Sequence, residues 1–190
     1  MEHPPPDHKN WTWVLDEPCP ECGFDASTIA PDQVAGRVRS NAAAWRAVLT
    51  RGSMVDQRPP VAPGQPPVWS ALEYGAHVRD VYDLAAERTL LMLKKKGPTF
   101  VNWDQNVTAV DQDYRNEDAN RVAYDLAVNA GRFADLLDKV QGDQWNRTGV
   151  RSDGSAFTVA SFALYLLHDP VHHLDDVEKG FEAIKEASEQ

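Results

Sequence analysis

Residues 70–96 read SALEYGAHVRDVYDLAAERTLLMLKKK. Ser70 followed three residues later by Glu73 is a capping box, in which each side chain bonds the other's backbone N–H at a helix start. Apolar residues then recur at helical spacing, at Val81, Leu84 and Leu91. The lysine run precedes Gly97-Pro98, where cations suit the carbonyl end of a helix. This segment therefore predicts a long amphipathic helix from Ser70 to about Lys95.

Three further segments have a helical apolar period. The first begins at Pro31, the second lies between the polar loop 97–116 and Gly142, and the third is capped by Thr158 and runs toward Asp176. Residues 51–68 are rich in proline and glycine and form a long connection, whereas 143–157 suggest a turn or short hairpin. The pattern predicts an all-α four-helix bundle.

The chain has the length of one domain, and it divides into three parts. Residues 1–29 are rich in proline, tryptophan and turn formers and are expected to form an irregular N-terminal arm. Residues 30–178 form the bundle, and 179–190 form a polar C-terminal extension.

Charge and composition exclude several classes of function. Lys and Arg number 19 against 29 Asp and Glu, a net charge of −10 that repels nucleic acid and anionic lipid. The N-terminus lacks a secretory signal, and no apolar run approaches the roughly 20 residues that span a membrane. Two closely spaced cysteines suit a reducing compartment. We expect a cytoplasmic protein without nucleic-acid or membrane partners.

Three of the six histidines lie in Leu167-His168-Asp169-Pro170-Val171-His172-His173. His168 and His172 are four residues apart, so a helix places them on one face with their Cβ atoms about 5–6 Å apart. Both imidazoles can then reach one ion. His173 is rotated by about 100° from His172 and is the alternative ligand. Pro170 is expected to kink the helix, or to end and restart it, beside the pair.

His77 shares the core-facing row of its helix with Val81 and Leu84. An imidazole in that row needs a partner, which in a purely structural interpretation is a carbonyl or carboxylate. His77 and the histidine pair on the last helix together predict a divalent-metal site formed by His77, His168 and His172.

The sequence resembles the DinB-like family of metal-binding bundles. The resemblance covers about residues 30–178 and rests on 70–77, Trp103-Asp104, 145–148 and 168–176. The family includes thiol-using transferases and the mycothiol-dependent maleylpyruvate isomerase, and its metal is held by one histidine of the second helix and a pair four apart on the last. The resemblance implies the same set, His77, His168 and His172. The glutamine that follows the pair in many members is replaced here by Leu174-Asp175-Asp176.

Three imidazoles leave coordination positions open, as in catalytic sites. Zinc is the first choice and nickel the second. The resemblance implies a thiol-dependent S-transferase or isomerase that acts on a small electrophile, with a low-molecular-weight thiol such as mycothiol. The alternatives are a metal-dependent hydrolase and a non-catalytic, metal-stabilised binding or dimerisation module. The expected partner is a small-molecule substrate or thiol. A second copy of the chain, in a homodimer, is a further candidate.

Other polar residues have candidate roles. Asp169, Glu73 and Asp104 are candidates to orient the ligating histidines. Arg147 and Arg151 either meet a substrate carboxylate or remain solvated. Cys19-Pro20-Glu21-Cys22-Gly23 resembles half of a zinc ribbon, so Cys19 and Cys22 mark a possible separate site that His3 and His8 would complete. The simpler interpretation is a pair of reduced or redox-sensitive thiols.

Overall fold

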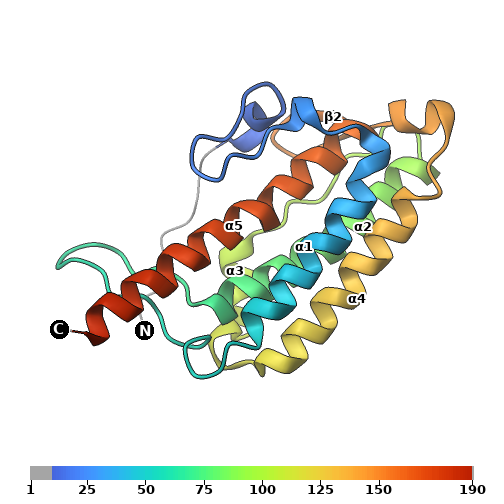
Figure 1. Cartoon of the computed structure of the whole chain (residues 1–190). Helices are drawn as coiled ribbons and strands as arrows, with labels where there is room; N and C mark the ends of the chain where they lie inside the picture. Colours follow the sequence, from blue (N-terminus) through green and yellow to red (C-terminus); the bar gives the residue numbers. More distant parts are fainter. Residues whose placement is uncertain (1–9, 190) are drawn as a thin grey trace.

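Four long helices form the body of the protein in the computed structural model, which describes residues 10–189 (Figure 1). They are α1 (Val34–Leu49), α2 (Ala71–Lys94), α4 (Ala119–Leu137) and α5 (Val159–Ser188). Both α1 and α2 pack mainly against α4 and α5 rather than against each other. Helices α1 and α2 are therefore diagonally opposite in the bundle. The long connection between α1 and α2 therefore crosses the bundle. The predicted all-α four-helix bundle is confirmed.

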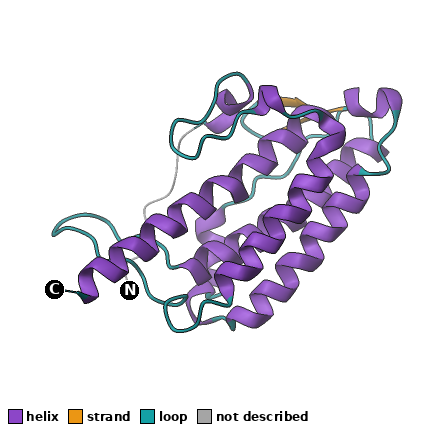
Figure 2. Cartoon of the chain, viewed as in Figure 1, coloured by secondary structure: helices purple, strands orange, loops and turns teal. Residues whose placement is uncertain are grey.

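The remaining elements are short (Figure 2). Within residues 10–189 the strands are β1 (Thr148–Val150) and β2 (Ala156–Thr158), which pair antiparallel in the predicted hairpin. Gly149 is required there because a Cβ at this position would lie 2.5 Å from the ring of Phe100. The other short elements are α3 (Gln105–Asp111) and the 3-10 turns η1 (Trp11–Leu15), η2 (Ala26–Thr28), η3 (Pro31–Gln33), η4 (Tyr114–Asn116) and η5 (Gly142–Asn146).

The predicted helix starts are confirmed at α2 and α5. Ser70 Oγ accepts from the backbone of Glu73, and the Glu73 carboxylate accepts from the backbone of Ser70. Thr158 Oγ1 accepts from the backbone N–H of Ser161. Helix α2 ends at Lys94, within the lysine run.

The segment expected as a polar loop, 97–116, contains α3 and η4. Asp104 caps α3, because its Oδ1 accepts from the backbone of Asn106 at 3.0 Å and of Val107 at 3.1 Å. Helix α3 spans only two turns, which is too short to give a repeating apolar stripe, so periodicity could not reveal it.

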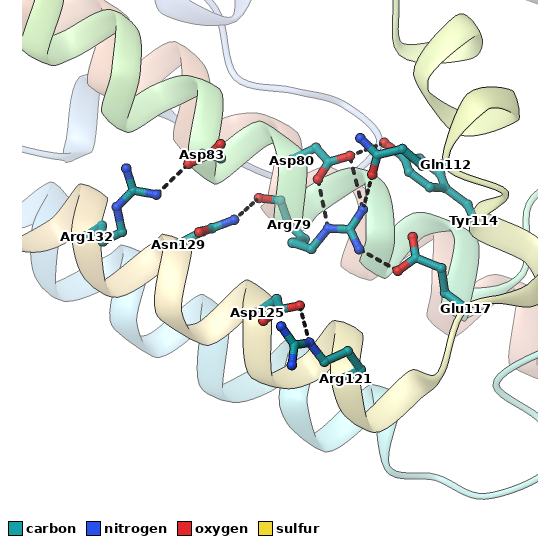
Figure 3. Close-up of polar contacts among 10 residues, drawn as sticks. All are labelled: Arg79, Asp80, Asp83, Gln112, Tyr114, Glu117, Arg121, Asp125, Asn129 and Arg132. Atoms are coloured by element: carbon teal, nitrogen blue, oxygen red, sulfur yellow. Dashed lines mark hydrogen bonds and ion pairs between the residues drawn. The ribbon is translucent and has the colours of Figure 1, made fainter.

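An arginine on α2 anchors this segment to the bundle (Figure 3). Arg79 donates to Glu117 Oε2 at 2.6 Å and to Gln112 Oε1 at 2.7 Å, and it also bonds its neighbour Asp80. Tyr114 Oη donates to Asp80 Oδ2 at 2.5 Å. The guanidinium group of Arg79 is largely buried, but these hydrogen bonds and ion pairs compensate its burial. The segment after α3 is therefore held against α2.

Helix α5 continues through Pro170, so of the two expected alternatives the helix does not end and restart there. The carbonyl of Pro170 accepts from Asn41 Nδ2 at 3.2 Å and from Trp45 Nε1 at 3.0 Å, both on α1. Tyr82 of α2 donates to Asn41 Oδ1 at 2.7 Å. We call these four residues the Pro170 network. All its bonds are buried, so water does not replace a lost partner, and the network fixes the rotation of α5.

The described part of the N-terminal arm packs on α5, and the C-terminal residues up to Ser188 belong to that helix. Val14, Cys19 and Phe24 of the arm are buried, although residues 10–29 of the arm form only 3-10 turns and loops. Residues 179–188, expected as a polar extension, are the last turns of α5, and Phe181 there is buried. No helix among residues 10–189 combines the length and apolar character needed to cross a membrane.

The Pro170 network predicts that Tyr82→Phe is destabilising. The substitution leaves Asn41 Oδ1 buried without its donor, which costs about 1–3 kcal/mol of unfolding free energy. Urea unfolding followed by circular dichroism measures the difference. Tyr124→Phe is the matched control, because Tyr124 is an exposed tyrosine. This control should change stability by less than about 0.5 kcal/mol. Equal small effects of the two changes would show that the network does not stabilise the fold.

Candidate metal centre

The sequence of α5 from His168 to His173 places metal-binding side chains on two neighbouring faces. His168 and His172 form one pair four residues apart, and Asp169 and His173 form another. Consecutive residues differ by about 100° around a helix, so the two pairs point in different directions. The structure accordingly divides these side chains between two clusters.

The first cluster, the α2 cluster, consists of His77, Asp169 and His173. Its ligand atoms all lie within 4.8 Å of one another. His77 Nε2 is 3.2 Å from Asp169 Oδ1, and His173 Nε2 is 3.8 Å from the same oxygen. The fully buried His77 of α2 thus meets the alternative ligand of the sequence analysis, His173, and a residue expected only to orient ligands, Asp169.

The surroundings of the α2 cluster position its imidazoles. The ring of Trp103 stacks on His77 with centroids 5.6 Å apart, and Tyr74 lies against His173 at 4.8 Å. His173 Nδ1 donates to Asp176 Oδ2 at 2.9 Å, which turns its Nε2 toward Asp169. His77 Nδ1 is buried and has no hydrogen-bond partner within residues 10–189.

The two carboxylates at this cluster are ionised. Burial raises the pKa of Asp169, but the fields of His77 and His173 and the hydrogen bond from His77 outweigh it, so the pKa lies well below its usual range. Burial also opposes ionisation of Asp176, and the hydrogen bond and charge of His173 again lower the pKa. An ionised Asp169 is in the form that binds metal.

The second cluster, the arm cluster, consists of Cys19, Cys22, His168 and His172, again with ligand atoms within 4.8 Å of one another. Burial, and then the proximity of His172, lowers the pKa of His168 to about 4, so this imidazole is neutral near pH 7. His77 therefore falls in one cluster, and His168 and His172 fall in the other. That these three residues share one ion stays a prediction. His3 and His8 lie outside the described residues.

The other predicted residues have separate roles. Glu73 is paired with Arg58, whose Nε donates to Glu73 Oε2 at 2.9 Å, and it also caps α2. Asp104 caps α3. Arg147 donates to the Leu93 carbonyl. These contacts engage Glu73 and Asp104 away from the histidines, whereas Asp169 lies directly among them.

A cavity of about 550 Å³ opens beside both clusters. Its lining includes Asp169 and His173 of the α2 cluster, His168 and His172 of the arm cluster, and several tryptophans. Arg88 and Arg151 also line it. Sequence reasoning missed Arg88, because an arginine on a helix with many polar residues carries no pattern that separates it from a solvated one.

The two arginines differ in their partners. Arg151, on the hairpin turn, donates to Tyr165 Oη at 2.9 Å and pairs with Asp153. Arg88 donates to the Val101 carbonyl at 2.9 Å. Burial, and then the charge of Arg151, lowers the pKa of Arg88. The guanidinium groups of Arg88 and Arg151 therefore repel each other in the lining of the cavity.

The fold and its family follow from comparison with known proteins. YfiT from Bacillus subtilis, described as a probable metal-dependent hydrolase with an unusual four-helix bundle topology, has a similar structure. The TM-score is 0.67 at 18% sequence identity, over 83% of this chain and 87% of that one, and the likeness shows a shared fold. No curated protein matches the sequence. The sequence profile of the DinB superfamily matches residues 3–177, nearly the whole chain. This chain therefore belongs to the DinB superfamily, as the resemblance in its sequence predicted.

Proposed function

We propose that this protein is a metal-dependent enzyme that acts on a small anionic molecule, with one divalent ion bound by His77, Asp169 and His173. The proposal rests on the convergence of these three side chains at a cavity that Asp169 and His173 line, with the buried His77 behind them. Zinc is the first choice of metal and nickel the second, since two imidazoles and a carboxylate suit both.

The spacing of the α2 cluster supports metal binding. Ligands at about 2.0–2.2 Å from one ion lie about 2.8–3.6 Å from each other in octahedral or tetrahedral geometry. The 3.2 Å between His77 Nε2 and Asp169 Oδ1 falls in this range, and the 3.8 Å to His173 Nε2 needs only a small shift. The separations of Asp169 from the two histidines thus support a shared ion.

The same cluster leaves room for a substrate. Three protein ligands are fewer than the four to six that such ions take, and an open position is what distinguishes a catalytic site from a structural one. The side chain of Asp169 is 35% exposed and that of His173 19%, toward the cavity that both residues line. A molecule in the cavity therefore reaches the ligands directly.

The chain's own residues hold the site in one arrangement. Asp176 bonds the second nitrogen of His173 and so fixes its ring, as carboxylates do for ligating histidines in metal sites. Trp69 and Trp103 pack against His77 and keep water from its buried side. The rings of both histidines are thus positioned before substrate arrives.

Arg88 and Arg151 support an anionic substrate. Both line the cavity, and their mutual repulsion would be relieved by a carboxylate or similar group bound between them. The pair would bind the charged end of the substrate while its reactive end faces the α2 cluster. This arrangement fits the small electrophile inferred from the sequence.

Two reactions suit such a site. When bound, a divalent ion supplies a Lewis acid that lowers the pKa of a coordinated thiol or water. The resemblance to thiol-using family members favours S-transfer or isomerisation with a low-molecular-weight thiol such as mycothiol. The description of YfiT as a probable metal-dependent hydrolase favours hydrolysis as the second candidate.

The proposal predicts which residues retain the metal. His77→Ala and Asp169→Asn should each lose one equivalent of metal per chain relative to the untagged parent, because each removes a ligand. Asp175→Asn, on the same helix but paired with Lys179, is the matched control and should keep the parent's metal content. Elemental analysis of the purified proteins measures this. Full metal retention in His77→Ala and Asp169→Asn would contradict the ligand assignment.

The choice between the two reactions can be tested with cobalt. In a Cys19→Ser, Cys22→Ser variant, which contributes no cysteine sulfur, an added thiol such as mycothiol should bind cobalt as thiolate and produce a sulfur-to-cobalt charge-transfer band in the near ultraviolet. An alcohol of similar size is the control. The absence of this band with every thiol, in protein whose bound cobalt still has an exchangeable water ligand, would contradict thiol transfer and favour hydrolysis.

A further inference from the structure

We propose that Cys19, Cys22, His168 and His172 form a second metal site, a closed Cys2His2 zinc site that fastens the N-terminal arm to α5. This site is separate from the α2 cluster and is structural rather than catalytic. It draws its ligands from two segments at opposite ends of the chain.

The distances among the four donors approach those of a zinc tetrahedron. With Zn–S bonds of about 2.3 Å and Zn–N bonds of about 2.0–2.1 Å, the ligand atoms of such a site lie about 3.3–3.8 Å apart. Cys19 Sγ lies 3.7 Å from His172 Nδ1, and all four donors lie within 4.8 Å of one another. Zinc binding therefore requires shifts of about 1 Å or less.

The local backbone directs both cysteines to the same point. The backbone N–H of Gly23 donates to the Cys19 carbonyl at 2.9 Å, and that of Cys19 donates to the Phe24 carbonyl at 2.8 Å. Gly23 has a positive φ, a conformation that glycine takes readily, and this closes the tight turn. The turn brings Cys22 back beside Cys19, facing α5.

A buried polar atom independently indicates a ligand. His168 is only 3% exposed, and its Nε2 has no hydrogen-bond partner within residues 10–189. Such an atom loses its hydration without compensation, and a metal ion would compensate it. Trp11 and Phe24 lie against the His168 ring at centroid distances of 5.4 Å each and shield this ring from solvent.

The chemistry of the donors selects zinc and a closed site. Two thiolates and two neutral imidazoles balance the charge of a divalent ion and complete tetrahedral coordination, which leaves no position for substrate. His172 Nε2 faces Glu21 at 3.6 Å and Asp176 at 3.8 Å. Carboxylates therefore lie near the nitrogen that would not bind zinc, as they do beside ligating histidines in metal sites.

The site would also shape the catalytic cavity. Trp11 and Glu21 belong to the arm and line the cavity beside the α2 cluster. Fixing the arm by zinc therefore fixes one wall of the cavity. Asp176 bonds His173 and approaches His172, so it lies between the two clusters.

Zinc X-ray absorption of the full-length, untagged His173→Ala variant tests the proposal. This variant retains the arm cluster and lacks a ligand of the α2 cluster, so failure of the proposed enzyme site does not affect the result. We expect one zinc per chain with two sulfur neighbours at about 2.3 Å and two nitrogen neighbours at about 2.0 Å. The adjacent His172→Ala change, made alone, should abolish the sulfur neighbours or the zinc that they hold.

Two outcomes would overturn the proposal. One is a zinc ion with only nitrogen and oxygen neighbours in His173→Ala, which would place the metal away from the cysteines. The other is a mass lower by two hydrogen atoms in freshly purified, metal-free protein, which would show Cys19 and Cys22 joined as a disulfide. Because the absorption experiment keeps both cysteines, its result does not depend on whether a cysteine variant folds.

Discussion

The rotation of α5 about its own axis is the constraint on which both clusters depend. The Pro170 carbonyl is held by Asn41 and Trp45 of α1, and Tyr82 of α2 holds Asn41 in turn. A rotation by one residue, about 100°, would move every side chain of this segment to a neighbouring face. The network therefore determines that Asp169 faces α2 and that His168 faces the arm.

This arrangement gives one helix two kinds of metal-binding surface. The α2 cluster has a nitrogen and oxygen donor set and borders a cavity with two arginines, which suits exchange of substrate at an open ion. The arm cluster has two sulfurs and two nitrogens under aromatic side chains, which suits a closed ion. Donor type and exposure, rather than the number of histidines, separate the proposed catalytic site from the proposed structural one.

Most of the bundle could be predicted from local patterns, and the partition of the site could not. The capping box at Ser70 and the cap at Thr158 predicted helix starts because a cap acts on its own first turn. The sequence also placed His77 in the core. It did not reveal which pair of α5 faces His77, because two pairs share the same spacing. Nor could it reveal that Cys19 meets His172, 153 residues away.

Anomalous diffraction at the zinc edge, from crystals of the full chain grown with zinc, tests most directly whether α5 divides its ligands between two ions. We expect two anomalous peaks on neighbouring faces of α5, one contacted by His77, Asp169 and His173 and the other by the arm cysteines with His168 and His172. A single peak contacted by His77, His168 and His172 together would contradict it.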